Sequence, residues 1–415
     1  MSQREGKGAS RLFTRNFTLL LLGQLFSLIG NGALKFALSM YVLEETGSAA
    51  VFGTLLAVSM VPTILLTPFG GVLADRANRR SIMVGLDLTS GAAVLAACAA
   101  FSAGRGLAVT AALLIVLSVL GAFESPTVQA CVPQMLSGDN VLRGNAAVNQ
   151  AAAVTGLAVP FLGSLLYVTF GIRPVLAGTA VCFLLTAALE CFIRLPAPPP
   201  APRQGVGAVL REDLLGSARF LVRERREVLD LLLYAALVSF FIAGVAVVGL
   251  PYLVRSELGL SAQVYGVVES AMGLAAILGG LSVGLLQNVI PMRRLNRLVT
   301  AVGACMVLAG CGLVLPLGAL GRRALLAAFF CAGQTGVSVF SIFAVSAIQQ
   351  RTPEQMTGKV MACVSTISLC AQPLGQLAYG LLFDAAAGSA WTVLLATGAA
   401  VCALGGGSGR VFEKF

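Results

Sequence analysis

Five ionisable side chains interrupt long apolar stretches of the sequence, in which charge is otherwise scarce: Lys35, Asp87, Glu124, Glu190 and Glu269. If such a stretch crosses a membrane, a charge within it costs about 2.5–3.5 kcal/mol on insertion scales and is a candidate functional group. A carboxyl group that takes up and releases protons must be shielded from water and yet reach it periodically. These residues are therefore the candidates for proton transfer and for buried charge pairs.

The four carboxyl groups differ in how well they suit proton transfer. Glu124 suits it best, because it directly precedes a Ser-Pro pair in a stretch that we expect to face a cavity. Glu269 is the second candidate, whereas Glu190 lies near the end of its stretch and is expected at the membrane surface. Asp87 follows a basic loop by two helical turns and could belong to the charge network of that loop. A counter-ion role of Glu124 for Lys35 is a further possibility, which would compete with proton transfer.

A polar stripe runs along the first apolar stretch. Gln24, Ser27, Asn31 and Lys35 are spaced so that they fall on one face of a helix. Such a stripe is not expected to face lipid and should line a wet cavity, although Lys35 could instead extend its ammonium group to the outer membrane surface. A later stretch has similar spacing and is predicted to line the cavity with Gln334, Ser338 and Ser341.

Other kinds of chemistry find no support in the sequence. The ten cysteines fall almost all in apolar stretches, none forms a Cys-x-x-Cys pair, and there is no histidine. We interpret these cysteines as small buried hydrophobic residues and expect no metal site. There is no phosphate-binding loop of the nucleotide-hydrolysing kind and no nucleophile elbow. We therefore expect no enzyme and no cofactor, and any energy source should be an ion gradient.

The composition is that of a membrane protein. Only 11% of the 415 residues are charged and the mean hydropathy is +0.90, whereas soluble domains carry about 25% charged residues. The apolar stretches are about 20–26 residues long, which is enough to cross a hydrocarbon core of about 30 Å. Backbone in lipid must satisfy its own hydrogen bonds, so each stretch should be a helix. The first stretch, from Phe17, is too long for a cleavable signal peptide.

Twelve membrane spans are predicted, at residues 17–41, 50–74, 81–103, 107–130, 145–168, 172–193, 228–253, 263–286, 296–317, 323–347, 358–383 and 389–407. With the N-terminus inside, 22 of the 28 Lys and Arg residues fall on the inner side and five on the outer side. This asymmetry predicts that both termini are cytoplasmic. The net charge of +10 is explained by these loops, so we expect no nucleic-acid partner.

An internal repeat divides the chain. Tyr41-Val-Leu-Glu-Glu-Thr-Gly is echoed about 212 residues later by Tyr252-Leu-Val-Arg-Ser-Glu-Leu-Gly, and each copy precedes a glycine-rich span and a short basic loop. We therefore predict two six-helix halves, 1–193 and 228–415, related by pseudo-symmetry. The segment 194–227 between them should be a cytoplasmic linker with a proline-rich start and an amphipathic helix, either at the membrane surface or packed on the bundle. Secondary transporters use such repeats to alternate access to a site at the midplane.

The most specific motif is the segment between the second and third spans, Gly71-Val-Leu-Ala-Asp75-Arg76-Ala-Asn78-Arg79-Arg80. It resembles the Gly-x-Leu-Ala-Asp-Arg-x-Gly-Arg-Arg loop of the major facilitator superfamily, with Asn78 where that family usually has glycine. Asparagine tolerates the left-handed backbone conformation next best, so we expect the tight turn to survive. Two further segments resemble the macrolide and siderophore exporter (drug:proton antiporter) branch, Gly23-Gln24 to Thr46-Gly47-Ser48 and Pro126 to Gln150.

The resemblance implies that the loop takes part in conformational change. Asp75 would pair with arginines or with a helix N-terminus across the interface of the two halves, and Arg79 and Arg80 would anchor the loop. Alternatively, Arg76, Arg79 and Arg80 only fix the orientation of the chain in the membrane.

A second motif lies in the fifth span. The segment Gly156-Leu-Ala-Val-Pro160-Phe-Leu-Gly163 resembles the glycine-proline motif of proton-coupled antiporters, but Val159 replaces the usual glycine before the proline. Proline and glycine also kink and pack membrane helices without any part in coupling, so both interpretations stay open.

These patterns predict an all-α membrane protein with twelve transmembrane helices in two six-helix halves, the major facilitator fold. The resemblance implies a multi-pass secondary transporter of the inner or plasma membrane, exporting amphipathic organic compounds (drug or macrolide-like) by alternating access in exchange for protons. The alternatives are a dedicated exporter of a metabolite such as a siderophore, and a lysolipid transporter or flippase. The expected partners are the lipid bilayer and a small amphipathic substrate, and the expected oligomeric state is a monomer.

Overall fold

The computed structural model of the chain describes residues 12–101, 105–195, 221–223, 225–286, 291, 294–316 and 318–412. Within these ranges the side chains of residues 75, 139, 319, 354, 355, 357–359, 410 and 411 are not described. Most of the predicted linker and its amphipathic helix therefore lie outside the described residues, and so does the side chain of Asp75.

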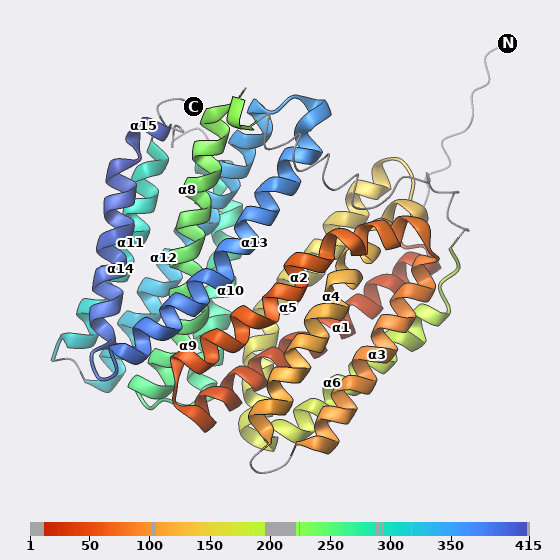
Figure 1. Cartoon of the computed structure of the whole chain (residues 1–415), viewed down its shortest axis with the longest axis horizontal. Helices are drawn as coiled ribbons and strands as arrows, with labels where there is room; N and C mark the ends of the chain where they lie inside the picture. The colour runs from red at the N-terminus through yellow and green to blue at the C-terminus, as the bar shows by residue number, and fades with distance from the viewer. Residues whose placement is uncertain are drawn as a thin grey trace.

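Over the described ranges the chain is helical and contains no strand (Figure 1). The helices of the first half are α1 (Arg15–Thr46), α2 (Ala49–Arg76), α3 (Arg79–Ala100), α4 (Gly106–Met135), α5 (Asp139–Phe170) and α6 (Ile172–Cys191). Those of the second half are α8 (Arg226–Ala243), η1 (Gly244–Gly249), α9 (Leu250–Tyr252), η2 (Leu253–Glu257), α10 (Ala262–Leu286), α11 (Leu295–Val314), α12 (Ala319–Arg351), α13 (Glu354–Ala385), α14 (Ala390–Gly407) and α15 (Gly409–Phe412).

Twelve of these helical segments are long and apolar enough to cross a membrane, which confirms the predicted fold class. The predicted span ends differ from the helix ends by six residues or fewer, and most helices are longer than predicted. The reason is local: polar caps extend a helix beyond its apolar stretch. The side chain of Thr14 accepts a hydrogen bond from the N–H of Phe17 at the start of α1, and Ser48 does the same for Val51 at the start of α2. Gly47 ends α1 with a φ of 62°, which suits glycine.

The seventh span is irregular. α8, η1, α9 and η2 follow one another without a break, and η1 and η2 are π-helical turns. Pro251 lies between them and has no N–H to donate, so regular α-helical hydrogen bonding cannot continue through it. The span runs to Glu257, whereas the prediction ended it at residue 253. π-Helical turns occur frequently at functional sites.

The two halves are pseudo-symmetric in sequence as well as in helix order. Gly163-Ser-Leu-Leu-Tyr167 in α5 is matched by Gly375-Gln-Leu-Ala-Tyr379 in α13, at the same spacing as the repeat found from the sequence. The halves meet chiefly along two helix pairs, α2 with α13 and α5 with α10. The exact boundaries predicted for the halves and the linker stay predictions.

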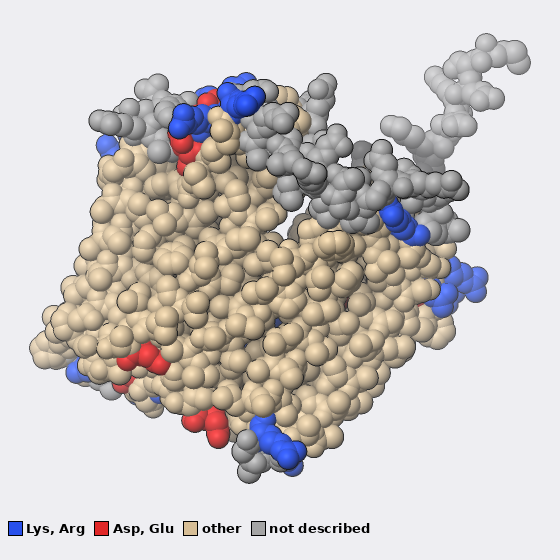
Figure 2. Space-filling model, viewed as in Figure 1, with Lys and Arg blue, Asp and Glu red and all other residues tan. Residues whose placement is uncertain are grey.

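Because the number of spans is even, α1 begins and α14 ends on the same face of the molecule, here called the terminal face. The opposite face, with the α1–α2 turn and the end of η2, is called the distal face. In Figure 1 the halves come together at the distal face and diverge toward the terminal face. In the view of Figure 2, charged side chains gather near these two faces and the surface between them is almost uncharged, as expected for a membrane-spanning protein.

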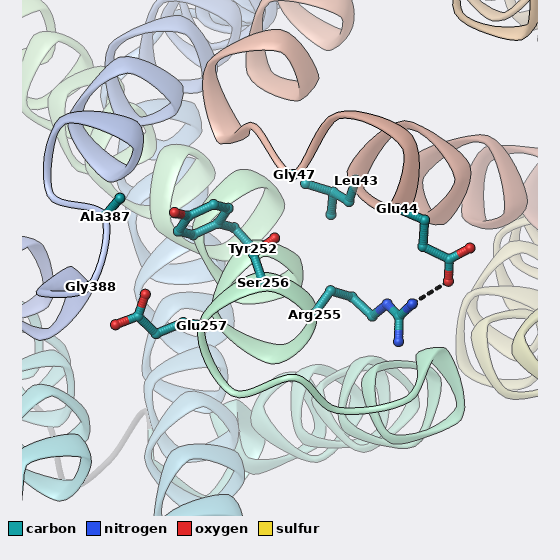
Figure 3. A pocket seen from close by; sticks show the side chains of 9 residues that line it. All are labelled: Leu43, Glu44, Gly47, Tyr252, Arg255, Ser256, Glu257, Ala387 and Gly388. Atoms are coloured by element: carbon teal, nitrogen blue, oxygen red, sulfur yellow. Dashed lines mark hydrogen bonds and ion pairs between the residues drawn. The ribbon is translucent and has the colours of Figure 1, made fainter. Parts of the chain in front are cut away.

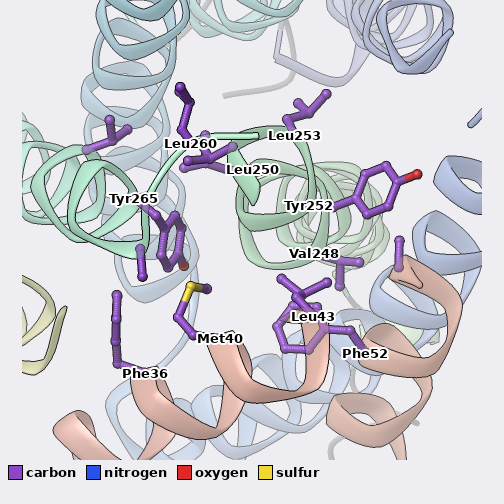
Figure 4. Close-up of a cluster of buried hydrophobic side chains, with 14 of the residues drawn as sticks. Phe36, Met40, Leu43, Phe52, Val248, Leu250, Tyr252, Leu253, Leu260 and Tyr265 are labelled. Atoms are coloured by element: carbon purple, nitrogen blue, oxygen red, sulfur yellow. The ribbon is translucent and has the colours of Figure 1, made fainter. Parts of the chain in front are cut away.

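A hydrophobic cluster joins the halves near the distal face (Figure 4). α1 contributes Phe36, Met40 and Leu43, and these side chains pack with residues of η1, α9, η2 and α10. The ring of Phe36 stacks on that of Tyr265 with 5.4 Å between centroids and 22° between planes. Burying these side chains away from water and lipid holds the distal ends of the two halves together.

Candidate functional site

Three carboxyl groups of the first half lie close together in its interior. Asp87 of α3 and Glu190 of α6 are neighbours, 2% and 1% exposed, and Glu124 of α4 is near enough to act on both electrostatically. Glu124 accepts a hydrogen bond from Ser27 Oγ of α1 at 3.1 Å. One oxygen of Asp87 and both oxygens of Glu190 have no hydrogen-bond partner among the described atoms, and no described Lys or Arg pairs with any of the three. Adjacent carboxylates repel each other when both are ionised, so this arrangement suits groups that share and exchange protons.

The structure buries Glu190, although its place in the last turn of α6 is the one expected for a residue near the membrane surface. α6 packs closely on α1 because Gly23 has no side chain: a Cβ there would lie 3.3 Å from Thr186 Cγ2 and 3.7 Å from Glu190 Cγ. Thr186 also donates a hydrogen bond to the carbonyl oxygen of Gly23 at 3.0 Å. Glu190 is therefore covered by α1 although it lies in the last turn of α6.

The polar stripe of α1 faces α4, the helix that carries Glu124. Gln24 and Ser27 are buried, Asn31 is half-buried and Lys35 is exposed. The Ser27–Glu124 hydrogen bond is the contact that fixes this direction. Lys35 does not pair with Glu124 in this structure.

The corresponding residues of the second half are divided between two environments. Gln334 lies with Met272, Met306, Phe329 and Phe330 around an apolar recess between η1, α10, α11 and α12. By contrast, Ser338 packs on α10: a Cβ at Gly279 of α10 would lie 3.1 Å from the Cβ of Ser338. Ser341 is exposed. Glu269 of α10 is half-buried beside the hydroxyl of Tyr265, one helical turn before Met272.

The distal face is held closed by a charge contact between the halves (Figure 3). Arg255 of η2 forms a salt bridge with Glu44 of α1, and its guanidinium also donates to the carbonyl oxygen of Leu260 at 2.5 Å. The hydroxyl of Tyr167 in α5 donates to the other oxygen of Glu44 at 2.6 Å. Glu44 and Arg255 border an open pocket on the distal surface, which also includes Tyr252.

A second contact between the halves lies beside the first. Asp384, at the end of α13, accepts hydrogen bonds from Ser48 Oγ at 2.5 Å and from the N–H of Ala49 at 2.6 Å. Ser48 and Ala49 form the N-terminus of α2, where the helix dipole and unpaired N–H groups favour a negative charge. Together with the salt bridge, this contact ties α1 and α2 of one half to η2 and α13 of the other.

Glycines allow the helices of the two halves to approach closely along the pairs α2 with α13 and α5 with α10. A Cβ at Gly53 of α2 would lie 2.4 Å from the carbonyl oxygen of Gln376 in α13. A Cβ at Gly266 of α10 would lie 2.6 Å from the carbonyl oxygen of Pro160 in α5. Such distances leave no room for alanine, so glycine is required for this approach.

The glycine-proline motif of α5 lies on two of these contacts. Gly156 and Pro160 face α10, and a Cβ at Gly273 would lie 3.3 Å from the carbonyl oxygen of Gly156. Pro160 cannot donate to that oxygen, which therefore lacks its usual helical partner. Gly163 faces α1 instead. A Cβ at Gly163 would lie 3.4 Å from the Cα of Ala33. The motif thus has a packing role at the junction of the halves, and a role in coupling stays a prediction.

The loop between α2 and α3 is fastened to neighbouring helices. Arg79 donates to the carbonyl oxygens of Ala74 at 2.7 Å and of Ala130 at 3.0 Å, and Arg80 donates to that of Cys191. Asn78 is the N-cap of α3 with φ −68° and ψ 108°, so it is extended and not left-handed as expected. Its side chain instead accepts from the N–H of Ser81 at 3.4 Å, a cap that glycine could not provide.

The remaining residues of this loop carry less information. Gly71 has open space around the position of a Cβ, and Arg76 is exposed at the end of α2. The side chain of Asp75 is not among those described, so its predicted pairing across the halves stays a prediction.

Comparison with known proteins assigns this architecture to a family. The family model described as Major Facilitator Superfamily matches residues 20–376. The chain belongs to the major facilitator superfamily. Among its relatives, macrolide efflux protein A of Streptococcus pyogenes is 22% identical over 388 residues, covering 92% of each chain. The enterobactin exporter of Citrobacter koseri is 26% identical over 362 residues, covering 83% of this chain and 79% of the exporter.

Solved structures agree on the major facilitator fold. A crystal structure of a mutant of the nucleoside transporter NupG superimposes with a TM-score of 0.77, at 11% identity, covering 95% of this chain and 99% of that one. A bacterial homologue of the iron transporter ferroportin, in its inward-facing state, superimposes with a TM-score of 0.70 at 18% identity, covering 96% and 98%. The relatives and the fold are those of transporters and not of enzymes.

In this major facilitator chain, sequence reasoning missed the distal contacts. Glu44, Arg255 and Asp384 lie at helix ends, where charged residues are ordinary and attract no attention. One signal was available: Glu44 and Arg255 occupy equivalent places in the repeat, three residues after Tyr41 and Tyr252, and carry opposite charges. Equivalent positions near the pseudo-symmetry axis face each other, so the reversal of charge pointed to a contact.

Proposed function

We propose that this major facilitator chain is a proton-coupled exporter of amphipathic organic compounds that works by alternating access. The observation that carries the proposal is the cluster of Asp87, Glu124 and Glu190, three carboxyl groups without a described cationic partner inside one half. Buried carboxyl groups without cations are suited to binding protons, and ionisable residues within membrane spans mark ion pathways. Membership of the family and the two exporter relatives support the transport direction.

The distal contacts support alternating access. Under the orientation predicted from the basic loops, the distal face is the outer one. The salt bridge of Glu44 with Arg255 and the capping of α2 by Asp384 would then hold the outer side shut, while the halves diverge toward the cytoplasm. Opening outward requires both contacts to break. In that state we propose that the loop with Asp75, Arg79 and Arg80 closes the inner side.

The substrate class rests on the interior of the second half. The recess around Gln334 is small in this state, but its lining of aliphatic, aromatic and methionine side chains with a single amide group shows the character of this interior. Apolar walls with few polar groups suit loosely specified, partly apolar ligands, and methionine adapts to irregular shapes.

A dedicated metabolite exporter is the second candidate. It is favoured by the enterobactin exporter, the relative that is more similar in identity, although that protein shares a shorter region with this chain. The two candidates differ in breadth: a dedicated exporter should transport one compound and ignore a panel of unrelated amphipathic dyes.

The test is accumulation of fluorescent amphipathic compounds in cells that express the protein, with and without a protonophore. We expect lower accumulation than in control cells, and we expect the protonophore to abolish the difference. Asp87→Asn, Glu124→Gln and Glu190→Gln should each impair export, while Glu45→Gln, a change of an exposed carboxyl group on the distal face, should not. Export that survives both the protonophore and all three cluster variants would refute proton coupling through this cluster.

A further inference from the structure

Lys35 is a cation deep within the first span. It lies eleven residues before the end of α1 at Thr46, which places it about 16 Å from the distal end of the helix at 1.5 Å per residue. Its side chain is exposed, although those of Leu34 and Phe36 on either side are 1% and 5% exposed. A lysine at this depth is expensive to maintain in a membrane unless it faces a polar space or a partner.

Helix geometry gives the direction of the Lys35 side chain. Successive residues of an α-helix are turned by about 100°. Ser27 points to α4, with which it is hydrogen-bonded, and Gly32 points to α5, where a Cβ would meet Val159 at 2.6 Å. Lys35 lies about 80° from the first direction and about 60° from the second, between them. Phe26 and Ile29 lie on the side of the helix away from Lys35. Both are exposed apolar residues, as expected of a side that faces lipid. Lys35 therefore faces the interior between α4 and α5, and not lipid.

Lys35 has no partner among the residues that the structure describes. Among the described residues it forms neither an ion pair nor a hydrogen bond, and it is not the counter-ion of Glu124, which is bound to Ser27. Asp87 and Glu190 adjoin each other, and Glu269 adjoins Tyr265. An ammonium group that faces the interior and lacks an internal anion is free to bind one that enters from outside.

We propose that Lys35 binds the anionic group of the transported compound, so that the substrates are amphipathic organic anions. The inference rests on the proposed function for the existence of a transported amphiphile, and it adds the sign of its charge. The carboxyl cluster and Lys35 then have separate tasks: the cluster exchanges protons and the lysine holds the substrate's carboxylate, phosphate or similar group. A cationic amphiphile would be repelled at this position.

The experiment measures binding to the purified full-length protein in nanodiscs. The probe is 11-(dansylamino)undecanoic acid, and its methyl ester is the neutral match with the same apolar body and fluorophore. We expect the wild type to bind the acid at least about tenfold more tightly than the ester. Lys35→Met should abolish this preference by weakening only the acid, whereas Lys35→Arg should retain it. Arg105→Met removes an exposed cation at the distal end of α4 and should leave both affinities unchanged.

Several results would overturn the proposal. These are equal binding of acid and ester by the wild type, no binding of the acid, or an acid preference that persists in Lys35→Met. Retention of the preference by Lys35→Arg guards against a Lys35→Met variant that is merely misfolded, since both are checked by size-exclusion chromatography. Competition with lysophosphatidylglycerol and with zwitterionic lysophosphatidylcholine distinguishes a lipid from a soluble acid as the source of the anion.

The proposed function is tested separately in proteoliposomes, by uptake of the same acid with and without a pH gradient. Loss of the gradient effect with intact acid selectivity at Lys35 would refute proton coupling and leave the anion site standing. Gradient-driven transport that is indifferent to the charge of the probe would refute the anion site and leave the coupling standing.

Discussion

Replacing Asp384 by asparagine should release the distal face. The carboxylate accepts hydrogen bonds from Ser48 Oγ at 2.5 Å and from the N–H of Ala49 at 2.6 Å, across the junction of the halves. Asparagine is nearly the same size, so packing is preserved. It has one acceptor oxygen in the place of two and no negative charge, and its amide N–H group would point at one of the two donors.

The magnitude follows from these contacts. A hydrogen bond to a charged group contributes about 1.5–3 kcal/mol, and a negative charge at a helix N-terminus about 0.3–1 kcal/mol. If about one bond and the charge are lost, the closed form is weakened by about 2 kcal/mol relative to the form that is open at the distal face. Since about 1.4 kcal/mol is a factor of ten, the ratio of open to closed molecules should rise about thirtyfold.

The assay is the distance between spin labels on the two halves, measured by pulsed electron paramagnetic resonance in a cysteine-free variant. Arg105 of the first half and Ser261 of the second are exposed at the distal face and take no part in the closing contacts. The wild type should give mainly the short distance, and Asp384→Asn should add a longer one. Glu45→Gln, which removes a neighbouring exposed carboxylate, is the matched control and should resemble the wild type. A distance distribution for Asp384→Asn that is the same as that of the control would refute the assignment of a closing role.

Three further outcomes are expected. Glu44→Arg should increase the population that is open at the distal face in the same assay, and Glu44→Arg combined with Arg255→Glu should restore closure. If the double variant has as large an open population as the single one, the salt bridge does not close the face. Gly53→Ala places a Cβ 2.4 Å from a backbone oxygen of α13 and should destabilise the closed form by about 1–3 kcal/mol. The measurement is the melting temperature in detergent, which should fall. Gly71→Ala, with open space around the new Cβ, should leave the melting temperature unchanged. Asp75→Asn should impair transport with normal membrane insertion, and full activity would exclude a role of the loop at the junction.

The sequence predicted the spans because a membrane helix is specified by the length of its apolar stretch. The predicted spans were shorter than the helices where polar residues continue the helix beyond the apolar stretch, as at Thr14 before α1 and in the first turns of α5. The irregular seventh span was missed, although Pro251 was a visible reason for it. Helical hydrogen bonding around a proline depends on neighbouring turns and is not encoded by hydropathy.

The candidate site was predicted only in part, because sequence gives the depth of a residue and not its neighbours. Asp87 and Glu124 were recognised as buried carboxyl groups, but their proximity to Glu190 depends on how α3, α4 and α6 pack. Glu190 was assigned to the surface from its place near a helix end, and the close approach of α6 at Gly23 covers it. Gln334 and Ser338 share a helical face, yet one faces a recess and the other a glycine of α10.

The salt bridge of Glu44 and Arg255 also constrains how such a chain can have arisen. In a dimer of two identical six-helix subunits, a residue near the twofold axis meets its own copy, so a glutamate would oppose a glutamate and an arginine an arginine. Opposite charges at equivalent positions are possible only when the two halves have different sequences. The lock on the distal face is therefore a property of the fused, diverged chain, and no symmetric pair of either half could form it.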